Sequence, residues 1–240
     1  MRLVICTFIA IVIVSVTSCR FGGKKIVGNG TLQTRTYSIA DFTEVHLAGN
    51  MDVYLTQGST YSVRVEADEN LFDYLEVEKD GNELEIGARH GYNLRPKAGI
   101  KVYVSAPTFE AAELAGSGKI VSQTKITNVK SIRISVAGSG DVDMEVDAPE
   151  VKAGVAGSGN VVLKGATKEF SVDIAGSGDV KAFNLMSEVS KIDIAGSGNV
   201  EVSASRELDV DVAGSGDVFY KGNPSVKHNK MGSGGVRKAG

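Results

Sequence analysis

The sequence predicts an all-β protein: a parallel β-helix of about seven coils, preceded by a β-rich region that caps one end of the stack. Three observations lead to this fold. A tetrapeptide, Ala-Gly-Ser-Gly, recurs at nearly constant spacing. Apolar residues alternate with polar ones on both sides of each copy. The residue that follows each copy is usually Asp or Asn.

The repeat is the most specific signal in the chain. Its spacings are 22, 19, 19, 20, 18 and 18 residues, and the last of the seven copies is degenerate. A period near 19 indicates a repeat architecture, in which each unit buries its apolar face against its neighbours. The copies begin at Ala115, Ala137, Ala156, Ala175, Ala195, Ala213 and Met231.

The segments around each copy have the residue pattern of β-strands. Ile132, Ile134 and Val136 precede one copy, and Val142 and Met144 follow it, so apolar residues occupy every second position. Period-two alternation of β-branched residues is typical of half-buried strands. No stretch of the repeat region shows a sustained helical period.

Two strands per repeat can be wound as a meander of hairpins or as a coil that stacks on the preceding coil. Hairpins normally need turn pairs such as Asn-Gly at each reversal. Here the linking segments vary, as in Asp147-Ala148-Pro149, whereas the Gly-Ser-Gly corner is constant. A stacked coil explains this better, because the same corner recurs on the same edge at a strand spacing of about 4.8 Å.

The corner glycines are expected at inward positions or at positions of positive φ, where a side chain would be crowded. A Cβ in the middle of the stack should cost roughly 1–3 kcal/mol. The terminal pair, Gly232 and Gly234, should tolerate the change because solenoids fray at their ends. The structural glycines are Gly116, Gly118, Gly138, Gly140, Gly157, Gly159, Gly176, Gly178, Gly196, Gly198, Gly214 and Gly216.

The residue after each central corner alternates between aspartate and asparagine. Stacked in register, these side chains would form an Asx ladder in which no two carboxylates are directly opposed. The amide of each asparagine can donate to its aspartate neighbours. The ladder residues are Asp141, Asn160, Asp179, Asn199 and Asp217.

Residues 34–110 lack the Gly-Ser-Gly corner and are expected to form the N-terminal β-rich region, with 111–240 as the repeat β-helix. One or two helical turns over 68–74 would be capped by Asp68, and Ala48-Gly49-Asn50 is a trace of an eighth copy. The degenerate copy at Met231, with Lys227, Lys230, Arg237 and Lys238 nearby, would cap the other end. Strands are expected at 44–47, 51–56, 61–67, 75–79, 83–88 and 100–105.

Residues 1–18 have the pattern of a secretory signal: Arg2, an apolar run over 3–16, and small residues before Cys19. Val16-Thr17-Ser18-Cys19 resembles the lipobox of bacterial lipoproteins, in which the cysteine is acylated; an ordinary signal peptide is the alternative. Residues 19–33 would then be the lipidated N-terminus and a basic tether. We expect an envelope protein that is lipid-anchored to the outer membrane. The periplasmic face is slightly favoured, because no acidic residue follows Cys19 directly, and the cell surface is the alternative.

Several stretches together resemble the head domain of auto-transporter adhesins, the GIN-domain family of Bacteroidetes-type cell envelopes. They are the lipobox, residues 42–53, residues 67–71 and the recurrent Gly-Ser-Gly-(Asp/Asn)-Val. The resemblance covers about 34–236. It implies a right-handed β-helix and an adhesin role, and it brings no catalytic residues. The chain shows neither a translocator barrel nor a long stalk in its sequence, which argues against auto-transport by this polypeptide.

Composition excludes several classes of function. The net charge is −3, from 26 basic and 29 acidic residues, so binding to nucleic acid by counterion release is not expected. The three histidines show no ligand spacing, and neither a metal nor another cofactor is expected. A calcium array is disfavoured, because one carboxylate per coil cannot supply the 6–8 oxygens that Ca²⁺ takes.

The expected function is that of a non-catalytic adhesin-like or scaffolding module whose partners are the membrane, through its anchor, and a glycan or protein ligand. The alternative is a polysaccharide-processing β-helix enzyme, which would need clustered carboxylates and aromatic platforms for sugar rings. The oligomeric state does not follow from the sequence. Candidate ligand contacts in the N-terminal region are Tyr37, Tyr54, Tyr61, Tyr92 and Tyr103, although packing roles are favoured for most of them.

Overall fold

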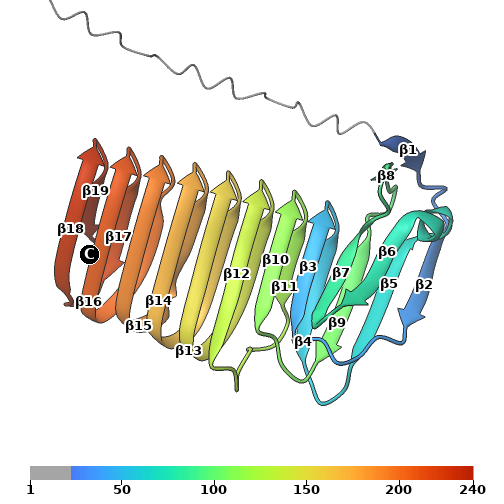
Figure 1. Cartoon of the computed structure of the whole chain (residues 1–240), viewed down its shortest axis with the longest axis horizontal. Coiled ribbons are helices and arrows are strands. Elements are labelled where there is room, and N and C mark those ends of the chain that lie inside the picture. The colour runs from blue at the N-terminus through green and yellow to red at the C-terminus, as the bar shows by residue number, and fades with distance from the viewer. Residues whose placement is uncertain (1–22, 240) are drawn as a thin grey trace, which may run out of the picture.

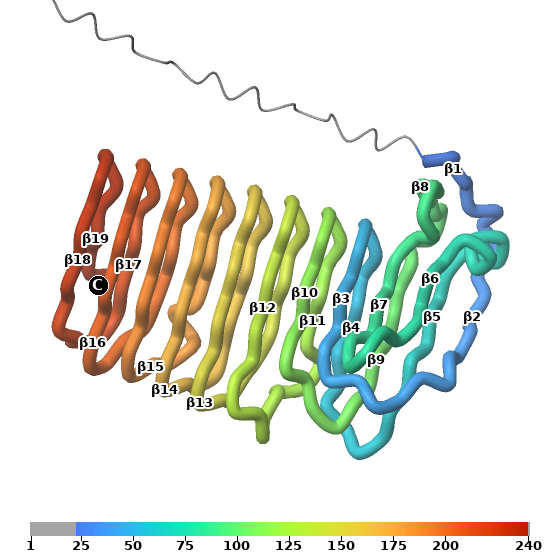
Figure 2. The backbone as a smooth tube through the Cα atoms, in the orientation of Figure 1, coloured from blue at the N-terminus to red at the C-terminus, as the bar shows by residue number. Residues whose placement is uncertain are grey.

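The computed structural model describes residues 23–239, which form one elongated stack of strands (Figure 1, Figure 2). The stack is a parallel β-helix of about seven turns, which confirms the predicted fold class. The expected signal segment, Cys19 and the first part of the expected tether lie outside the described residues. Within 23–239, no helix is long and apolar enough to cross a membrane.

Each turn contributes one strand to each of two facing walls. Wall A holds the strands that run into a Gly-Ser-Gly corner, and wall B holds the strands that leave it. Four long strands bend between turns and therefore belong to both walls. The repeat strands are β10 (Ala111–Gly116), β11 (Lys119–Ser122), β12 (Ser131–Gly138), β13 (Asp141–Gly157), β14 (Asn160–Gly176), β15 (Asp179–Gly196), β16 (Val200–Gly214), β17 (Asp217–Lys221), β18 (Ser225–Gly232) and β19 (Gly235–Lys238).

All repeat strands pair in parallel, and the register advances by one sequence repeat per turn. On wall A, Ala137 lies opposite Ala156, which lies opposite Ala175. On wall B, Asp141 lies opposite Asn160 in the same way. The register shifts on both sides of β15: between Val162 and Lys164 in its pairing with β14, and at Ala182/Met186 and Ser187/Val189 in its pairing with β16. The longer repeat is accommodated there by bulges.

The sequence trace at Ala48-Gly49 is a true coil. Strands β3 (Glu44–Gly49) and β4 (Asp52–Gln57) stack on β10 and β11, with Gly49 opposite Gly116. On the far side of this coil lie β7 (Glu83–Ala88) and β9 (Lys101–Ala106), both parallel to it. The spatial order therefore differs from the chain order, because β7 and β9 follow β3 and β4 in sequence and lie farther from the repeats (Figure 1).

The remaining N-terminal elements close this end of the stack. Strand β5 (Ser62–Asp68) pairs antiparallel with β9 and with β2 (Leu32–Tyr37), while β6 (Leu75–Asp80) pairs antiparallel with β7. The short 3₁₀ helix η1 (Glu69–Tyr74) buries Leu71 and Phe72 in the core. The expected role of this region as a cap on the solenoid agrees with this arrangement.

Inward side chains of the two walls form a dry core along the whole stack. Val136, Val155, Ile174, Ile194 and Val212 occupy one inward column of wall A and are all at most 4% exposed. Their β-branched side chains stack in register on the pleated surface, which explains why the sequence keeps them at one position of the repeat. The walls therefore leave only their outer faces, corners and ends free for binding.

Two local expectations are corrected by the structure. Within the tether expected over 19–33, Lys24–Val27 form strand β1, which pairs in parallel with β8 (Tyr92–Arg95). Asp68 makes no side-chain cap to η1. It is fully buried, and its carboxylate accepts hydrogen bonds from the backbone amides of Gly30, at 2.7 Å, and Lys97, at 2.8 Å. Long-range partners have replaced the local cap.

The six expected N-terminal strands are all present, with ends that differ by at most two residues. Strands β1, β2 and β8 were not expected. β2 is largely exposed and lacks apolar alternation, and β1 and β8 have only four residues each. Their strand conformation comes from pairing with partners that are distant in sequence.

Candidate functional site

The first glycine of each corner is required by backbone conformation. At Gly138, Gly157, Gly176, Gly196 and Gly214, φ lies between 123° and 142°, a range that side chains of L-residues rarely adopt. The carbonyl of each such glycine accepts the amide of the corner serine in the next turn; Ser177 donates to Gly157 at 2.8 Å. A Cβ on Gly157 would lie 2.5 Å from the carbonyl oxygen of Gly138. Gly116 has the same geometry.

The second glycine of each corner faces inward and has no room for a side chain. A Cβ on Gly159 would collide with the Gly140 carbonyl oxygen and the Val136 side chain of the preceding turn. The first glycine of a corner is therefore required both by its positive φ and by crowding, whereas the second is required by crowding alone. Gly118, Gly140, Gly178, Gly198 and Gly216 are similarly crowded by the neighbouring turn.

The Asp and Asn residues after the corners lie on the outside of wall B in one row. The Asn160 amide donates to Asp141 at 2.8 Å, and the Asn199 amide donates to Asp179 at 3.1 Å. Asn199 in turn accepts the backbone amide of Asp217 at 3.1 Å. Each hydrogen bond joins successive turns, so this row contributes to the stacking of coils.

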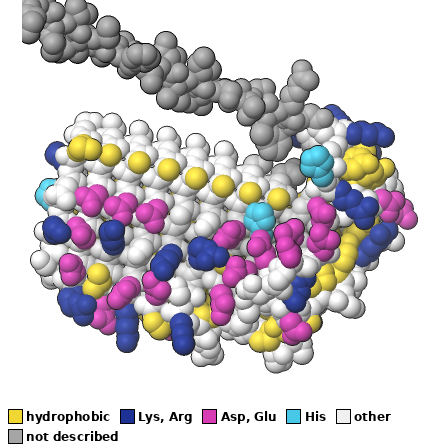
Figure 3. Space-filling view, in the orientation of Figure 1, with side chains coloured by type: hydrophobic (Ala, Val, Ile, Leu, Met, Phe, Trp, Pro, Cys, Tyr) yellow, Lys and Arg dark blue, Asp and Glu magenta, His cyan; other side chains and the backbone are white. Residues whose placement is uncertain are grey.

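The outer face of wall A carries a shallow groove along the helix axis. Its floor is one row of small apolar side chains next to the corners, and its volume is about 750 Å³. Figure 3 shows this row as a line of apolar side chains running across the turns. We call it the alanine groove; the row consists of Ala137, Ala156, Ala175, Ala195, Ala213 and Met231.

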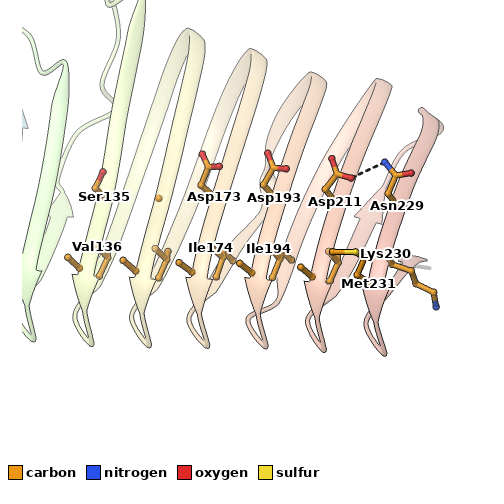
Figure 4. A pocket seen from close by; sticks show the side chains of 18 residues that line it. Ser135, Val136, Asp173, Ile174, Asp193, Ile194, Asp211, Asn229, Lys230 and Met231 are labelled. Atoms are coloured by element: carbon orange, nitrogen blue, oxygen red, sulfur yellow. Dashed lines mark hydrogen bonds between the residues drawn. The ribbon is translucent and has the colours of Figure 1, made fainter. Parts of the chain in front are cut away.

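A row of polar side chains borders the alanine groove (Figure 4). Asp173, Asp193 and Asp211 lie in register on successive turns, and Asn229 follows. Toward the N-terminal end the same row holds Ser135 and Gly154, which carry no charge. In-register carboxylates at a strand spacing of about 4.8 Å repel one another, so the three aspartates by themselves disfavour the stacking of these turns.

Neighbouring side chains partly neutralise the acidic row. Lys191 lies 3.3 Å from Asp193, whose hydrogen bond raises the pKa of the Lys191 ammonium. The Asn229 amide donates to Asp211 at 2.9 Å. At the far end of the groove, Lys230 and the exposed Met231 complete the lining.

None of the candidate tyrosines lines the alanine groove itself, although Tyr92 lines an adjoining pocket that shares Ala137 with it. Several of them contact other aromatic rings. Tyr54 stacks on Tyr103 with ring centres 5.2 Å apart, and Tyr61 packs on Phe42 at 5.1 Å. Tyr92 packs against Tyr74 at 4.7 Å. Burial raises the pKa of the Tyr37 hydroxyl.

The described residues contain no group of three or more His, Cys, Asp or Glu side chains placed to hold a metal ion. His46 contacts Glu83 at 3.3 Å, whereas His90 and His228 are exposed elsewhere on the molecule. Cys19 lies outside the described part of the chain.

A comparison with protein families matches residues 41–224 to the family described as "Putative auto-transporter adhesin, head GIN domain". The chain belongs to this family. The match spans the coil at Ala48 and six corners of the GIN domain, which confirms the resemblance noted from the sequence. Among curated proteins, none matches the chain.

Solved structures with the same architecture are similar to this GIN domain over nearly its whole length. A "putative lipid binding protein" from Parabacteroides distasonis is 29% identical, with a TM-score of 0.76, covering 90% of this chain and 100% of its own. A "putative adhesin" from Bacteroides fragilis is 22% identical, with a TM-score of 0.83, covering 89% and 100%. Another from Parabacteroides distasonis is 25% identical, with a TM-score of 0.70, covering 90% and 100%.

The alanine groove was not predicted from the sequence, although the repeat contains a pattern that indicates it. Aspartate stands two residues before the alanine in three consecutive repeats, as Asp173, Asp193 and Asp211. Alternation places that aspartate and the alanine on the same outer face. The glycines and the residue after them have the stronger periodic pattern, but they stabilise the stack of turns.

Proposed function

We propose that this chain is a lipid-anchored protein of the cell envelope whose β-helix is a non-catalytic, adhesin-type binding module. The alanine groove is its binding surface, and the ligand is an extended protein segment that carries basic side chains. The observation that carries this proposal is the groove itself: about 750 Å³, open along successive turns and bordered by three aspartates.

The lining favours a protein over a glycan as ligand. Sugar rings are commonly held on aromatic platforms, and none of the groove-lining residues is aromatic. An apolar floor beside a row of carboxylates suits an extended chain whose small apolar side chains contact the alanines and whose Lys or Arg side chains meet the aspartates. A row of like charges that costs the fold stability is a feature expected at a functional site.

Binding should be lost when the groove is filled. Ala175→Arg places a long side chain on the exposed floor, and we expect at least about tenfold weaker binding, equivalent to ~1.4 kcal/mol. Val162→Arg on the same strand, β14, is the matched control, because Val162 faces outward on wall B. Both changes are on the surface and should alter stability by only about 0.5 kcal/mol.

The measurement is a cell-binding assay with protein and glycan arrays, run beside a polysaccharide-cleavage screen. Equal binding by the two variants would remove the groove from the proposal. Binding to glycans alone would replace the protein ligand with a glycan. Reproducible cleavage without binding would overturn the non-catalytic role in favour of polysaccharide processing.

The anchor is tested separately. Replacing Cys19 with serine removes the thiol that would carry the lipid, so we expect the protein to move from the membrane fraction to the soluble fraction. Each buried methylene of an acyl chain contributes about 0.8 kcal/mol to membrane attachment. The wild type should incorporate labelled fatty acid and the variant should not. Retention of the variant in the membrane, with no label in the wild type, would contradict the anchor.

A second candidate function is favoured by the apolar lining and by the name of the Parabacteroides distasonis relative, a "putative lipid binding protein". In that case the groove would hold an acyl chain. A fluorescent fatty acid that binds the wild type and is excluded by Ala175→Arg would support this ligand over a basic protein segment.

A further inference from the structure

The last turn departs from the pattern of the core. In β16, Leu208, Val210 and Val212 face inward and are buried. The residues opposite them in β18 are, in the same order, Val226, His228 and Lys230. In-register residues of parallel strands point to the same side of a wall, so His228 and Lys230 occupy positions that are apolar in the preceding turn.

This turn is the C-terminal end of the stack (Figure 1). β18 lies against β16, and β19 lies against β17. All eight residues of β18 are exposed. The opposite end is closed by the antiparallel strands β2, β5 and β6 and by η1, so the two ends are finished in different ways.

An apolar last turn would be a hazard at such an end. A flat edge strand presents unpaired amides and carbonyls to any other strand. If its inward column were also apolar, a second β-helix could continue both the hydrogen bonding and the core. Identical repeats would stack particularly well, because their corners and inward columns already match from turn to turn.

His228 and Lys230 make that continuation unfavourable. Together with Val212 and Val236 they line a depression of about 250 Å³ at the open end. Figure 4 shows Lys230 at the end of the row of turns, with its side chain extending away from the preceding turn. Another turn stacked here would enclose the Lys230 ammonium beside apolar side chains, and desolvation of an unpaired charge is costly.

We propose that the C-terminal turn is a built-in stop: His228 and Lys230 at inward positions prevent the open end from pairing with a second copy of the chain. The proposal goes beyond the binding function and does not depend on it. It distinguishes these two residues from Lys227, which faces outward and lies 3.7 Å from Asp209.

The test replaces both residues by their counterparts in other turns, as His228→Val with Lys230→Ile. Full-length chain, extracted in mild detergent, is compared by sedimentation velocity. We expect the wild type to sediment as one species and the variant to shift to dimers and larger assemblies. Unchanged sedimentation of the variant, with native circular dichroism, would overturn the proposal.

The matched control is Lys227→Ile with Asn229→Val, which adds similar apolar surface on the same strand but on its outer side. We expect this control to remain a single species. If it associates as much as the inward variant, nonspecific hydrophobic association explains the assemblies and the proposal is wrong. Lys230→Glu keeps a charge at the inward position and should also remain a single species. If the double variant fails to fold, Lys230→Ile alone gives the same comparison.

Discussion

Replacing Gly176 with valine is expected to destabilise the protein by at least about 3 kcal/mol. Gly176 has a φ of 130°, where a non-glycine residue costs roughly 1–3 kcal/mol. A Cβ there would also lie well inside van der Waals contact with the Gly157 carbonyl oxygen, which accepts the Ser177 amide. The neighbour is backbone held from both sides by other turns, so it cannot move away cheaply.

The measurement is the melting temperature. For a chain of this size, 1 kcal/mol corresponds to roughly 2–4 °C, so a fall of about 6–12 °C is expected. Gly232→Val is the matched control: Gly232 has a φ of 132°, and a Cβ there meets the Gly214 carbonyl in the same way. Its local strain is the same, but it lies in the terminal turn.

The terminal turn limits the cost of strain. β18 is exposed along its length and can detach while the preceding turns remain folded, so Gly232→Val should lower the main transition only slightly. Gly234→Val should behave alike. These glycines are not locally permissive, since the neighbouring backbone crowds them as it does Gly176; only their position at the end makes them tolerant. Equal losses at Gly176 and Gly232 would contradict this account of the stack.

The regular part of the fold could be predicted because contacts with the adjacent turn determine which residue type fits at each position. Gly157 is glycine because of Gly138, and Asn160 follows a corner because Asp141 lies beneath it. Such reasons recur with the period, so a single sequence displays them several times. The same redundancy revealed the coil at Ala48, although it lies 67 residues before the next copy.

The N-terminal region could be predicted only as a set of strands. The position of β7 and β9 beyond β3 and β4 depends on pairings such as Tyr54 with Tyr103, which occur once and leave no periodic trace. Asp68 is a similar case. Its place before a short helix favoured a local cap, but its carboxylate instead accepts hydrogen bonds from the backbone amides of Gly30 and Lys97.

The alanine groove was missed for a different reason. Alanine and aspartate on an outer face are ordinary surface residues when taken singly. Their meaning appears only when the turns are stacked, because stacking turns Asp173, Asp193 and Asp211 into one acidic row and the alanines into one apolar floor. Register, rather than residue type, creates this site.

Replacing Asp68 with alanine is expected to release the beginning of the described chain. Asp68 is fully buried and accepts the Gly30 and Lys97 amides, and Gly28 passes so close that a Cβ there would collide with its carboxylate. Without the carboxylate, two amides lose their acceptors, at about 1–3 kcal/mol each where they stay buried. The cheaper response is for the segment to detach, so we expect local opening rather than global unfolding.

Hydrogen exchange measures this directly. The amides of residues 24–30 and of Lys97 should exchange much faster in Asp68→Ala, whereas those of β13–β15 should be unchanged. Asp73→Ala is the control, since Asp73 lies exposed in the same short helix. Unchanged protection of residues 24–30 in Asp68→Ala would show that the pairing of β1 with β8 and the hydrogen bonds of Asn70 to Val27 and Asn29 hold this segment without Asp68.

Release of this segment would also change how far the β-helix can lie from a membrane to which the chain is anchored as proposed. With Asp68 in place, the chain is fixed to the cap from β1 onward, so a lipid on Cys19 would hold the β-helix close to the bilayer. Release of the segment up to the start of β2 would add about nine residues of free chain, or roughly 30 Å of reach at full extension. In a chain anchored through Cys19 as proposed, Asp68→Ala should therefore increase protease cleavage between Gly23 and Leu32, while Asp73→Ala should not.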